Sequence, residues 1–119
     1  MAPQQFGVEA VLIDGAVTLH LQGELDLDTA PELHECVAVL LGEGVCQITM
    51  DLAELTFVDS TGLTVLVQTL KRLRDRGGDL TLLSPTASTK RILEITGLSQ
   101  ILPVIEGALP PTAPVRADG

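Results

Sequence analysis

The sequence predicts a single α/β domain in which helices pack against a mixed β-sheet. Three observations carry this prediction. Apolar strand-like stretches and stretches of helical spacing follow one another in the order β-β-α-β-α-β-α, with a possible final strand. The first two strands are separated only by a short turn signal, whereas helices separate the later ones, which favours right-handed parallel crossovers. The length of 119 residues, 45% of them hydrophobic, suits one domain with a real core.

The first two strands form a predicted hairpin. Residues 8–13 are strand-like, and Asp14-Gly15 is a strong signal for a tight turn. In the next segment Val17, Leu19 and Leu21 alternate with polar residues, so one face is expected to be buried and His20 to lie on the other. We interpret His20 as a polar-face residue rather than a catalytic base, because the sequence places no nucleophile or partner acid beside it.

The first helix is predicted to begin at Thr29 and to end at Gly42 and Gly44. Thr29 is suited to cap the helix, a proline follows in the first turn, and Glu32 completes a predicted capping box. Residues 45–52 are nearly continuous in apolar or β-branched character, as expected for a buried parallel strand.

The second helix is predicted over residues 60–76, with an apolar stripe toward the core and four cations at its C-terminal end. Gly77-Gly78 ends it. The remaining predicted elements are a buried strand at 79–83, a third helix that starts at Ser84-Pro85 and ends at Gly97, an edge strand or turn at 101–105, and a proline-containing mobile tail at 107–119.

The charge of the chain is strongly negative and uneven. No Lys or Arg precedes Lys71, so the first 70 residues sum to −11 and the remaining 49 to +2, which gives the net charge of −9. Such a field disfavours nucleic-acid binding and steers cationic partners, although solubility alone is an equally good explanation of the acidity. No apolar run approaches the roughly 20 residues of a membrane span, and the N-terminus lacks the features of a signal peptide. We therefore expect a cytoplasmic protein without a membrane partner.

Enzyme, metal and cofactor motifs are absent from the sequence. Cys36 and Cys46 are the only cysteines, and no CxxC or histidine pair at ligand spacing accompanies them, so we expect small core-type thiols rather than a metal site or a disulfide. There is no lysine-bearing phosphate loop, which disfavours a nucleotide-binding domain, and no Gly-x-Ser-x-Gly. We expect no cofactor and a binding function rather than catalysis.

The most informative segment is Asp59-Ser60-Thr61-Gly62. It follows an apolar strand-like run and opens the second amphipathic helix, where several backbone N–H groups lack helical partners. A hydroxyl at that place is suited to carry a phosphate. The alternative interpretation is that Ser60 only caps the helix, which would be worth about 1 kcal/mol.

Three segments in register resemble the STAS domain family, and within it the anti-sigma factor antagonists of bacteria. They are Gly23-Glu24-Leu25-Asp26, the segment from Phe57 to Leu63 that contains Asp59-Ser60-Thr61-Gly62, and the segment from Arg91 to Leu98. The resemblance covers residues 8–106, which places a STAS-like domain at 1–106 and leaves the tail at 107–119. Thr64 departs from the pattern, because the best-known antagonists carry glycine after the leucine.

The resemblance implies a partner switch. The unphosphorylated antagonist would bind an anti-sigma factor that is also an ATP-dependent serine kinase, the kinase would phosphorylate the antagonist, and a separate serine phosphatase would reset it. The acceptor would be Ser60, with Thr61 as the fallback. The partner-binding residues would be Glu24, Asp26, Asp28, Asp59, Ser60, Thr61, Gly62 and Thr64.

The acidic loop of Glu24, Asp26 and Asp28 is expected beside Ser60, because the carboxyl ends of parallel strands meet at one edge of a sheet. The alternative function is that of a STAS accessory subunit in a lipid-transport ABC complex or another transporter.

Overall fold

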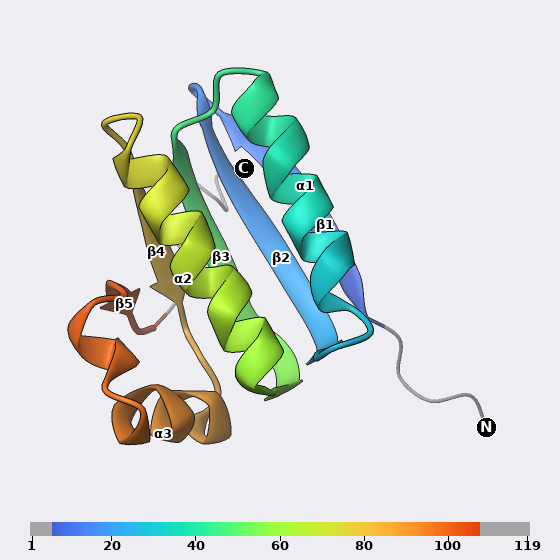
Figure 1. Cartoon of the computed structure of the whole chain (residues 1–119), viewed down its shortest axis with the longest axis vertical. Helices are drawn as coiled ribbons and strands as arrows, with labels where there is room; N and C mark the ends of the chain where they lie inside the picture. The colour runs from blue at the N-terminus through green and yellow to red at the C-terminus, as the bar shows by residue number, and fades with distance from the viewer. Residues whose placement is uncertain (1–5, 108–119) are drawn as a thin grey trace, which may run out of the picture.

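The computed structural model describes residues 6–107 of the chain and contains one five-stranded mixed sheet in the order β1-β2-β3-β4-β5 (Figure 1). The predicted tail at 107–119 lies outside these residues apart from Gly107. The elements are β1 (Gly7–Ile13), β2 (Ala16–Leu25), α1 (Ala30–Gly42), β3 (Gln47–Val58), α2 (Ser60–Arg74), β4 (Asp79–Leu83), α3 (Ala87–Ile95), a 3-10 turn (Leu98–Gln100) and β5 (Val104–Ile105). The predicted fold class is confirmed.

The β1–β2 hairpin forms as predicted. Strand β1 pairs antiparallel with β2 over its whole length, from Gly7 opposite Gln22 to Ile13 opposite Ala16. The connecting residues Asp14 and Gly15 both have positive φ, 52° and 82°, as a tight two-residue hairpin turn requires. Strands β2, β3, β4 and β5 then pair in parallel.

The alternation in β2 separates a buried face from an open one. Its odd-numbered side chains, such as Leu19 and Leu21, are almost fully buried, while Thr18, His20, Gln22 and Glu24 lie on the opposite face. Helices α1 and α2 lie side by side over the buried face (Figure 1). The core between helices and sheet consists almost entirely of Leu, Val, Ile and Met, as the scarcity of aromatic residues implies.

Strand β3 is longer than predicted: it runs to Val58, not Leu52. Its pairing with β2 contains two register shifts, which leave Ala53 and Thr56 as extra residues. Because of these bulges, the buried positions after Leu52 are spaced by three residues, at Leu55 and Val58, and the simple alternation breaks down. The bulged end carries the chain directly to the start of α2.

The first helix starts where predicted but lacks the predicted side-chain cap, and the third helix starts later than predicted. The Thr29 side chain does not cap α1; its hydroxyl donates to the Glu24 carbonyl at 2.7 Å, and the predicted capping box with Glu32 is not formed. The third helix begins at Ala87 rather than at Ser84-Pro85, with Thr86 as its cap accepting from the Thr89 N–H at 3.3 Å.

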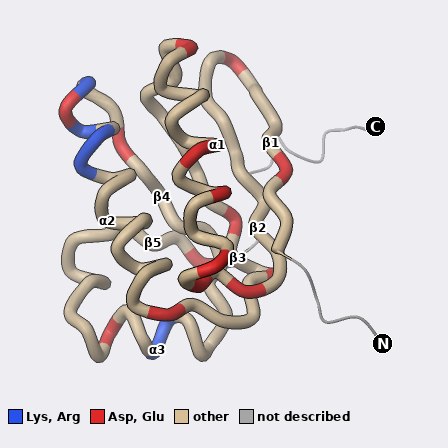
Figure 2. The backbone as a smooth tube through the Cα atoms, turned by 45° about the vertical axis from the view of Figure 1, so that its right-hand side comes forward, with Lys and Arg blue, Asp and Glu red and all other residues tan. Residues whose placement is uncertain are grey.

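Helix α2 connects two regions of opposite charge. It ends at Arg74, two residues before the predicted end, and Gly77 then adopts a positive φ of 80°. Its last turn and the following residues carry Lys71, Arg72, Arg74 and Arg76, which form the blue cluster in Figure 2. Its first turn lies about 22 Å away along the helix axis, next to the acidic loop after β2.

Candidate functional site at the start of helix α2

Asp59 organises the start of α2. It is the N-cap residue, in extended conformation, and its Oδ1 accepts the Gly62 N–H at 2.9 Å. Its backbone N–H donates to the Leu25 carbonyl at 3.1 Å, which ties the end of β3 to the end of β2. Its second oxygen, Oδ2, accepts the Leu27 N–H at 3.2 Å. One carboxylate therefore caps the helix and holds the loop after β2.

The acidic loop lies beside Ser60, as the parallel pairing of β2 and β3 predicts. Within this loop Asp26 has a structural role, because its Oδ1 accepts the N–H groups of Asp28 at 3.0 Å and Thr29 at 3.1 Å. The Asp26 carbonyl also accepts the Ala30 N–H at 2.7 Å. Asp28, in contrast, is exposed, and no hydrogen bond within the described residues involves its carboxylate.

Ser60 is the first residue of α2 and is exposed. No hydrogen bond within residues 6–107 involves its hydroxyl. Thr61, the alternative acceptor, is half-buried. Thr64 lies one turn further on the same face, exposed, and its hydroxyl donates to the Ser60 carbonyl at 2.9 Å. Of the two candidate acceptors, Ser60 is therefore the more exposed.

Gly62 allows the start of α2 to pack closely against the ends of β2 and β3. A Cβ at this position would lie 2.7 Å from both the Leu25 carbonyl oxygen and Val58 Cγ2, so only glycine lets the helix start approach the ends of β2 and β3 this closely. Gly62 is buried, and it therefore fixes the position of Ser60 without offering a side chain to a partner.

Two exposed apolar residues, neither of them among the predicted site residues, flank the site. Leu27, at the tip of the acidic loop, is 69% exposed, and Phe57 is 46% exposed. Phe57 of β3 pairs in register with Glu24 of β2, which puts both side chains on the open face of the sheet, near the carboxyl ends of these two strands. The signal available in the sequence was the apolar residue between two acids, Asp26-Leu27-Asp28, in a segment too short to belong to a core element.

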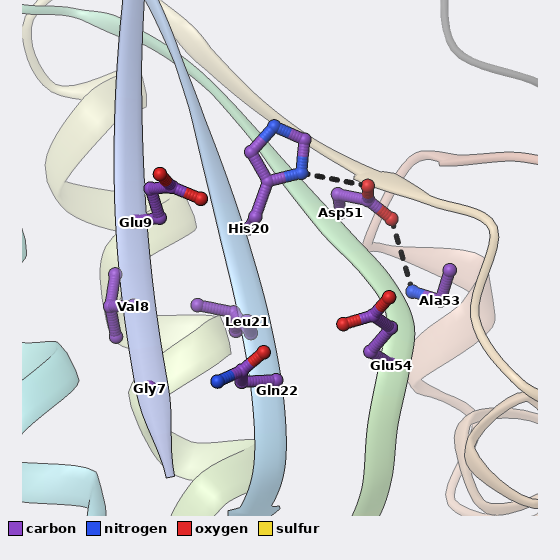
Figure 3. Close-up of a pocket in the computed structure, with 9 residues that line it drawn as sticks. All are labelled: Gly7, Val8, Glu9, His20, Leu21, Gln22, Asp51, Ala53 and Glu54. Atoms are coloured by element: carbon purple, nitrogen blue, oxygen red, sulfur yellow. Dashed lines mark hydrogen bonds and ion pairs between the residues drawn. The ribbon is translucent and has the colours of Figure 1, made fainter.

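A hollow of about 580 Å³ lies on the open face of the sheet, away from Ser60 (Figure 3). Here the structure corrects the sequence analysis, because it does place a partner acid beside His20: the Nδ1 of His20 lies 2.9 Å from Asp51 Oδ2 on β3. Asp51 Oδ1 accepts the Ala53 N–H at 3.0 Å, so both oxygens are used. The residues that line the hollow include no Ser, Thr or Cys.

The two cysteines are free thiols, each half-buried. Burial raises the pKa of the Cys36 thiol, and the nearby Glu32 carboxylate raises it further, so the reactive thiolate is disfavoured. Among the described residues, no three His, Cys, Asp or Glu side chains are placed to hold a metal ion, and no helix is long and apolar enough to cross a membrane.

Comparison with known proteins assigns the chain to a family. The STAS domain family matches residues 7–109 of the chain. The chain belongs to the STAS domain family. Within the family it is similar to the anti-sigma-B factor antagonist of Staphylococcus epidermidis, with 35% identity over 100 residues that cover 84% of this chain and 93% of the relative. The same identity and coverage hold for the anti-sigma-B factor antagonist of Staphylococcus aureus strain NCTC 8325.

The STAS fold is also found in solved structures. A crystal structure of an anti-sigma factor antagonist from Mycobacterium paratuberculosis matches with a TM-score of 0.77 and 26% identity, covering 87% of each chain. These relatives carry the name of a regulator and not of an enzyme, in agreement with the expectation that this STAS domain works by binding. In the STAS domain described above, the start of α2 is the place where an exposed serine hydroxyl, acidic residues and exposed apolar side chains occur together.

Proposed function

We propose that this STAS domain is an anti-sigma factor antagonist whose binding to its partner is controlled by phosphorylation of Ser60. The partner would be an anti-sigma factor that is also an ATP-dependent serine kinase, acting in the cytoplasm where ATP is available. The observation that carries the proposal is the exposed Ser60 hydroxyl, free of hydrogen bonds within the described residues, at the first position of α2. The similarity to named antagonists supports the class of partner.

The site is suited to accept a phosphoryl group without refolding. The backbone N–H groups of the first helical turn have no hydrogen-bond acceptor within the helix. The helix dipole also favours negative charge there, by about 0.3–1 kcal/mol for an exposed group. The Gly62 amide is already used by Asp59, so the helix stays capped in both states. The Ser60 oxygen would attack the γ-phosphorus of ATP, the bond from that phosphorus to the β–γ bridging oxygen would break with release of ADP, and a base of the kinase would take up the hydroxyl proton.

Phosphorylation would change the surface more than the fold. A phosphate adds about −1.5 to −2 charges next to the carboxylates of Asp59 and Asp28, which already make this edge acidic (Figure 2). A partner surface that accepts a serine hydroxyl would then meet a bulky dianion. A hundredfold loss of affinity requires about 2.7 kcal/mol, which is within the range of such an interfacial charge. A serine phosphatase would restore the binding form.

The proposal is tested by incubating the chain with its candidate kinase and ATP and mapping the modified residue by mass spectrometry. We expect the mass of one phosphate on the wild-type chain, located on Ser60, and none on Ser60→Ala. Thr61→Val is the matched control and should be modified like the wild type. Full modification of Ser60→Ala would refute the assignment of the acceptor.

A further inference from the structure

The two edges of the sheet differ greatly in length. Strand β5, at one edge, has only two residues, whereas β1, at the other, has seven. Strand β1 pairs with β2 from end to end without a register shift, and among the described residues no strand pairs with its outer side. Such an edge presents a row of backbone N–H and C=O groups that are ready to pair with another strand.

Strand β1 also lacks the features that usually prevent edges from pairing. It contains no Lys, no Pro and no bulge, and Glu9 is its only ionisable residue. Its last three residues are apolar and exposed: Val11 is 39%, Leu12 65% and Ile13 43% exposed. The short β5 edge needs no such protection, so the pairing potential of the sheet is concentrated on β1.

We propose that β1 is a homodimer interface, in which the β1 strands of two copies pair antiparallel about a two-fold axis at Ala10. The two sheets would then continue into each other, with helices α1 and α2 of both copies on the same face. This inference is independent of the proposed function, because β1 and the start of α2 belong to different parts of the fold: β2 lies between β1 and the end of β3 that leads to Ser60 (Figure 1).

The sequence of β1 suits pairing with itself. Full overlap of a seven-residue strand with its own copy places the fourth residue, Ala10, opposite itself, and sets Gly7 opposite Ile13, Val8 opposite Leu12 and Glu9 opposite Val11. Val8 and Leu12 share the helix-covered face, because they pair with the buried Leu21 and Val17 of β2. The apolar rows of the two copies would thus meet on that face.

The charge arrangement in this register also favours a second copy as the occupant. Glu9 faces Val11 of the other copy, so no carboxylate lies directly opposite another, which would be destabilising. The remaining obstacle is the net charge of −9 on each copy, whose repulsion is screened by salt. A dimer formed through β1 should therefore become tighter as the salt concentration rises, whereas a contact held by opposite charges would weaken.

Sedimentation velocity of the full chain over a range of concentrations, at low and high salt, tests the dimer. We expect a monomer–dimer equilibrium that shifts toward the dimer at high salt. Val11→Glu, which would face Glu9 of the other copy, should weaken the dimer about tenfold. Val11→Lys would instead face Glu9 with an opposite charge and should retain the dimer. Ile95→Glu, at an exposed apolar residue of α3 on the β4–β5 side of the sheet (Figure 1), is the control and should leave the dimer unchanged.

A monomer at every concentration and salt would overturn the proposal, and equal weakening by Val11→Glu and Val11→Lys would overturn the register. Cross-linking gives a second, independent measure of the register. Cα atoms of opposed residues in an antiparallel pair lie about 4.5–5.5 Å apart, which is within reach of a disulfide. Ala10→Cys should therefore form a covalent dimer on oxidation.

Leu12→Cys is the matched control for the cross-link. In the proposed register the two copies of residue 12 would be offset by four positions, about 13 Å, and should not cross-link. Both variants retain Cys36 and Cys46, so any background from these thiols is shared. Cross-linking of Leu12→Cys to the same extent as Ala10→Cys would contradict a two-fold axis at Ala10.

Discussion

Asp59 Oδ2 accepts the backbone N–H of Leu27 at 3.2 Å, across 32 residues of sequence. Through its other oxygen the same carboxylate caps α2 on the Gly62 N–H at 2.9 Å. The position of the acidic loop and the position of Ser60 are thus set by one side chain. A change at Asp59 is expected to affect both the stability of the helix start and the shape of the surface that a partner would meet.

Asp59→Asn should separate these two roles. Asparagine keeps one acceptor oxygen and remains a good N-cap, but its amide group cannot accept the Leu27 N–H. We expect a loss of about 1 kcal/mol in the free energy of unfolding, measured with denaturant, and faster hydrogen exchange at the Leu27 amide. Asp28→Asn is the control and should change the unfolding free energy by less than about 0.5 kcal/mol. An unchanged unfolding free energy and an unchanged exchange rate of the Leu27 amide in Asp59→Asn would show that the hydrogen bond to Leu27 does not stabilise the fold.

Gly62→Ala should destabilise the domain, because the added methyl group would overlap the Leu25 carbonyl and Val58. We expect a loss of about 1–3 kcal/mol in thermal or chemical unfolding. Gly42→Ala provides a contrast, since nothing lies within 4 Å of the corresponding Cβ at the end of α1. That variant should be neutral or more stable, by up to about 1 kcal/mol. Equal effects of the two substitutions would mean that the close approach at Gly62 is unimportant.

The parts of the fold that were predictable are those set by local rules. The Asp14-Gly15 turn, the apolar alternation of β2 and the glycine after α3 each follow from short-range conformational preferences, and all three are as predicted. The placement of the acidic loop beside Ser60 followed from the parallel pairing of β2 and β3, because their carboxyl ends lie at one edge.

The parts that could not be predicted depend on contacts between distant residues. The bulges at Ala53 and Thr56 appear only when β3 is aligned with β2, and they hide the continuation of the strand from a search for alternation. The loss of the Thr29 cap depends on the loop after β2, because the Asp26 N–H donates to the Thr29 hydroxyl oxygen at 2.9 Å, and the hydroxyl itself donates to the Glu24 carbonyl. The pairing of His20 with Asp51 likewise requires the register of two strands that are separated by a helix.

The exposed apolar side chain of Leu27 should act as an anchor for the partner. A few well-packed residues at the centre of an interface each account for about 2 kcal/mol or more of binding, and leucine is less common among them than Trp, Tyr or Arg, so we expect a smaller effect here. Leu27→Ala should therefore weaken binding to the anti-sigma factor by about 1–2 kcal/mol while leaving the unfolding free energy nearly unchanged, because the side chain is 69% exposed. Val39→Ala on α1, at 52% exposure, should change neither quantity. Calorimetric titration of both variants decides the matter, and equal affinities would remove Leu27 from the interface.

The acidic loop should accelerate association with a basic partner. On sequence grounds the pair to neutralise would be Asp26 and Asp28, but Asp26 holds the loop through two backbone N–H groups, so its replacement would disturb the fold. Glu24→Gln with Asp28→Asn is the cleaner test, because both residues are exposed.

We expect this double variant to associate several-fold more slowly at low salt and to show a weaker salt dependence, since steering by surface charge is screened over about 8 Å at physiological ionic strength. Stopped-flow association across a salt series is the appropriate measurement. The exposed acids of α1, Glu32 and Glu35, supply the control pair for the same total change in charge. If both double variants behave alike, net charge and not the loop governs association.

The central claim is that one phosphate on Ser60 separates this STAS domain from its partner. Two variants help to interpret a test of this claim. Ser60→Asp should reproduce part of the effect, because it carries less charge than a phosphate. Ser88→Asp introduces the same charge at another exposed serine in a first helical turn, that of α3, and should leave binding unchanged.

The most direct measurement is calorimetric titration of the anti-sigma factor, without ATP, with the unmodified chain and with the chain phosphorylated by its kinase. Our account predicts tight binding of the unmodified chain and about hundredfold weaker binding of the phosphorylated chain, a difference of about 2.7 kcal/mol, with the fold of both unchanged by circular dichroism. Equal affinities of the two forms would contradict it.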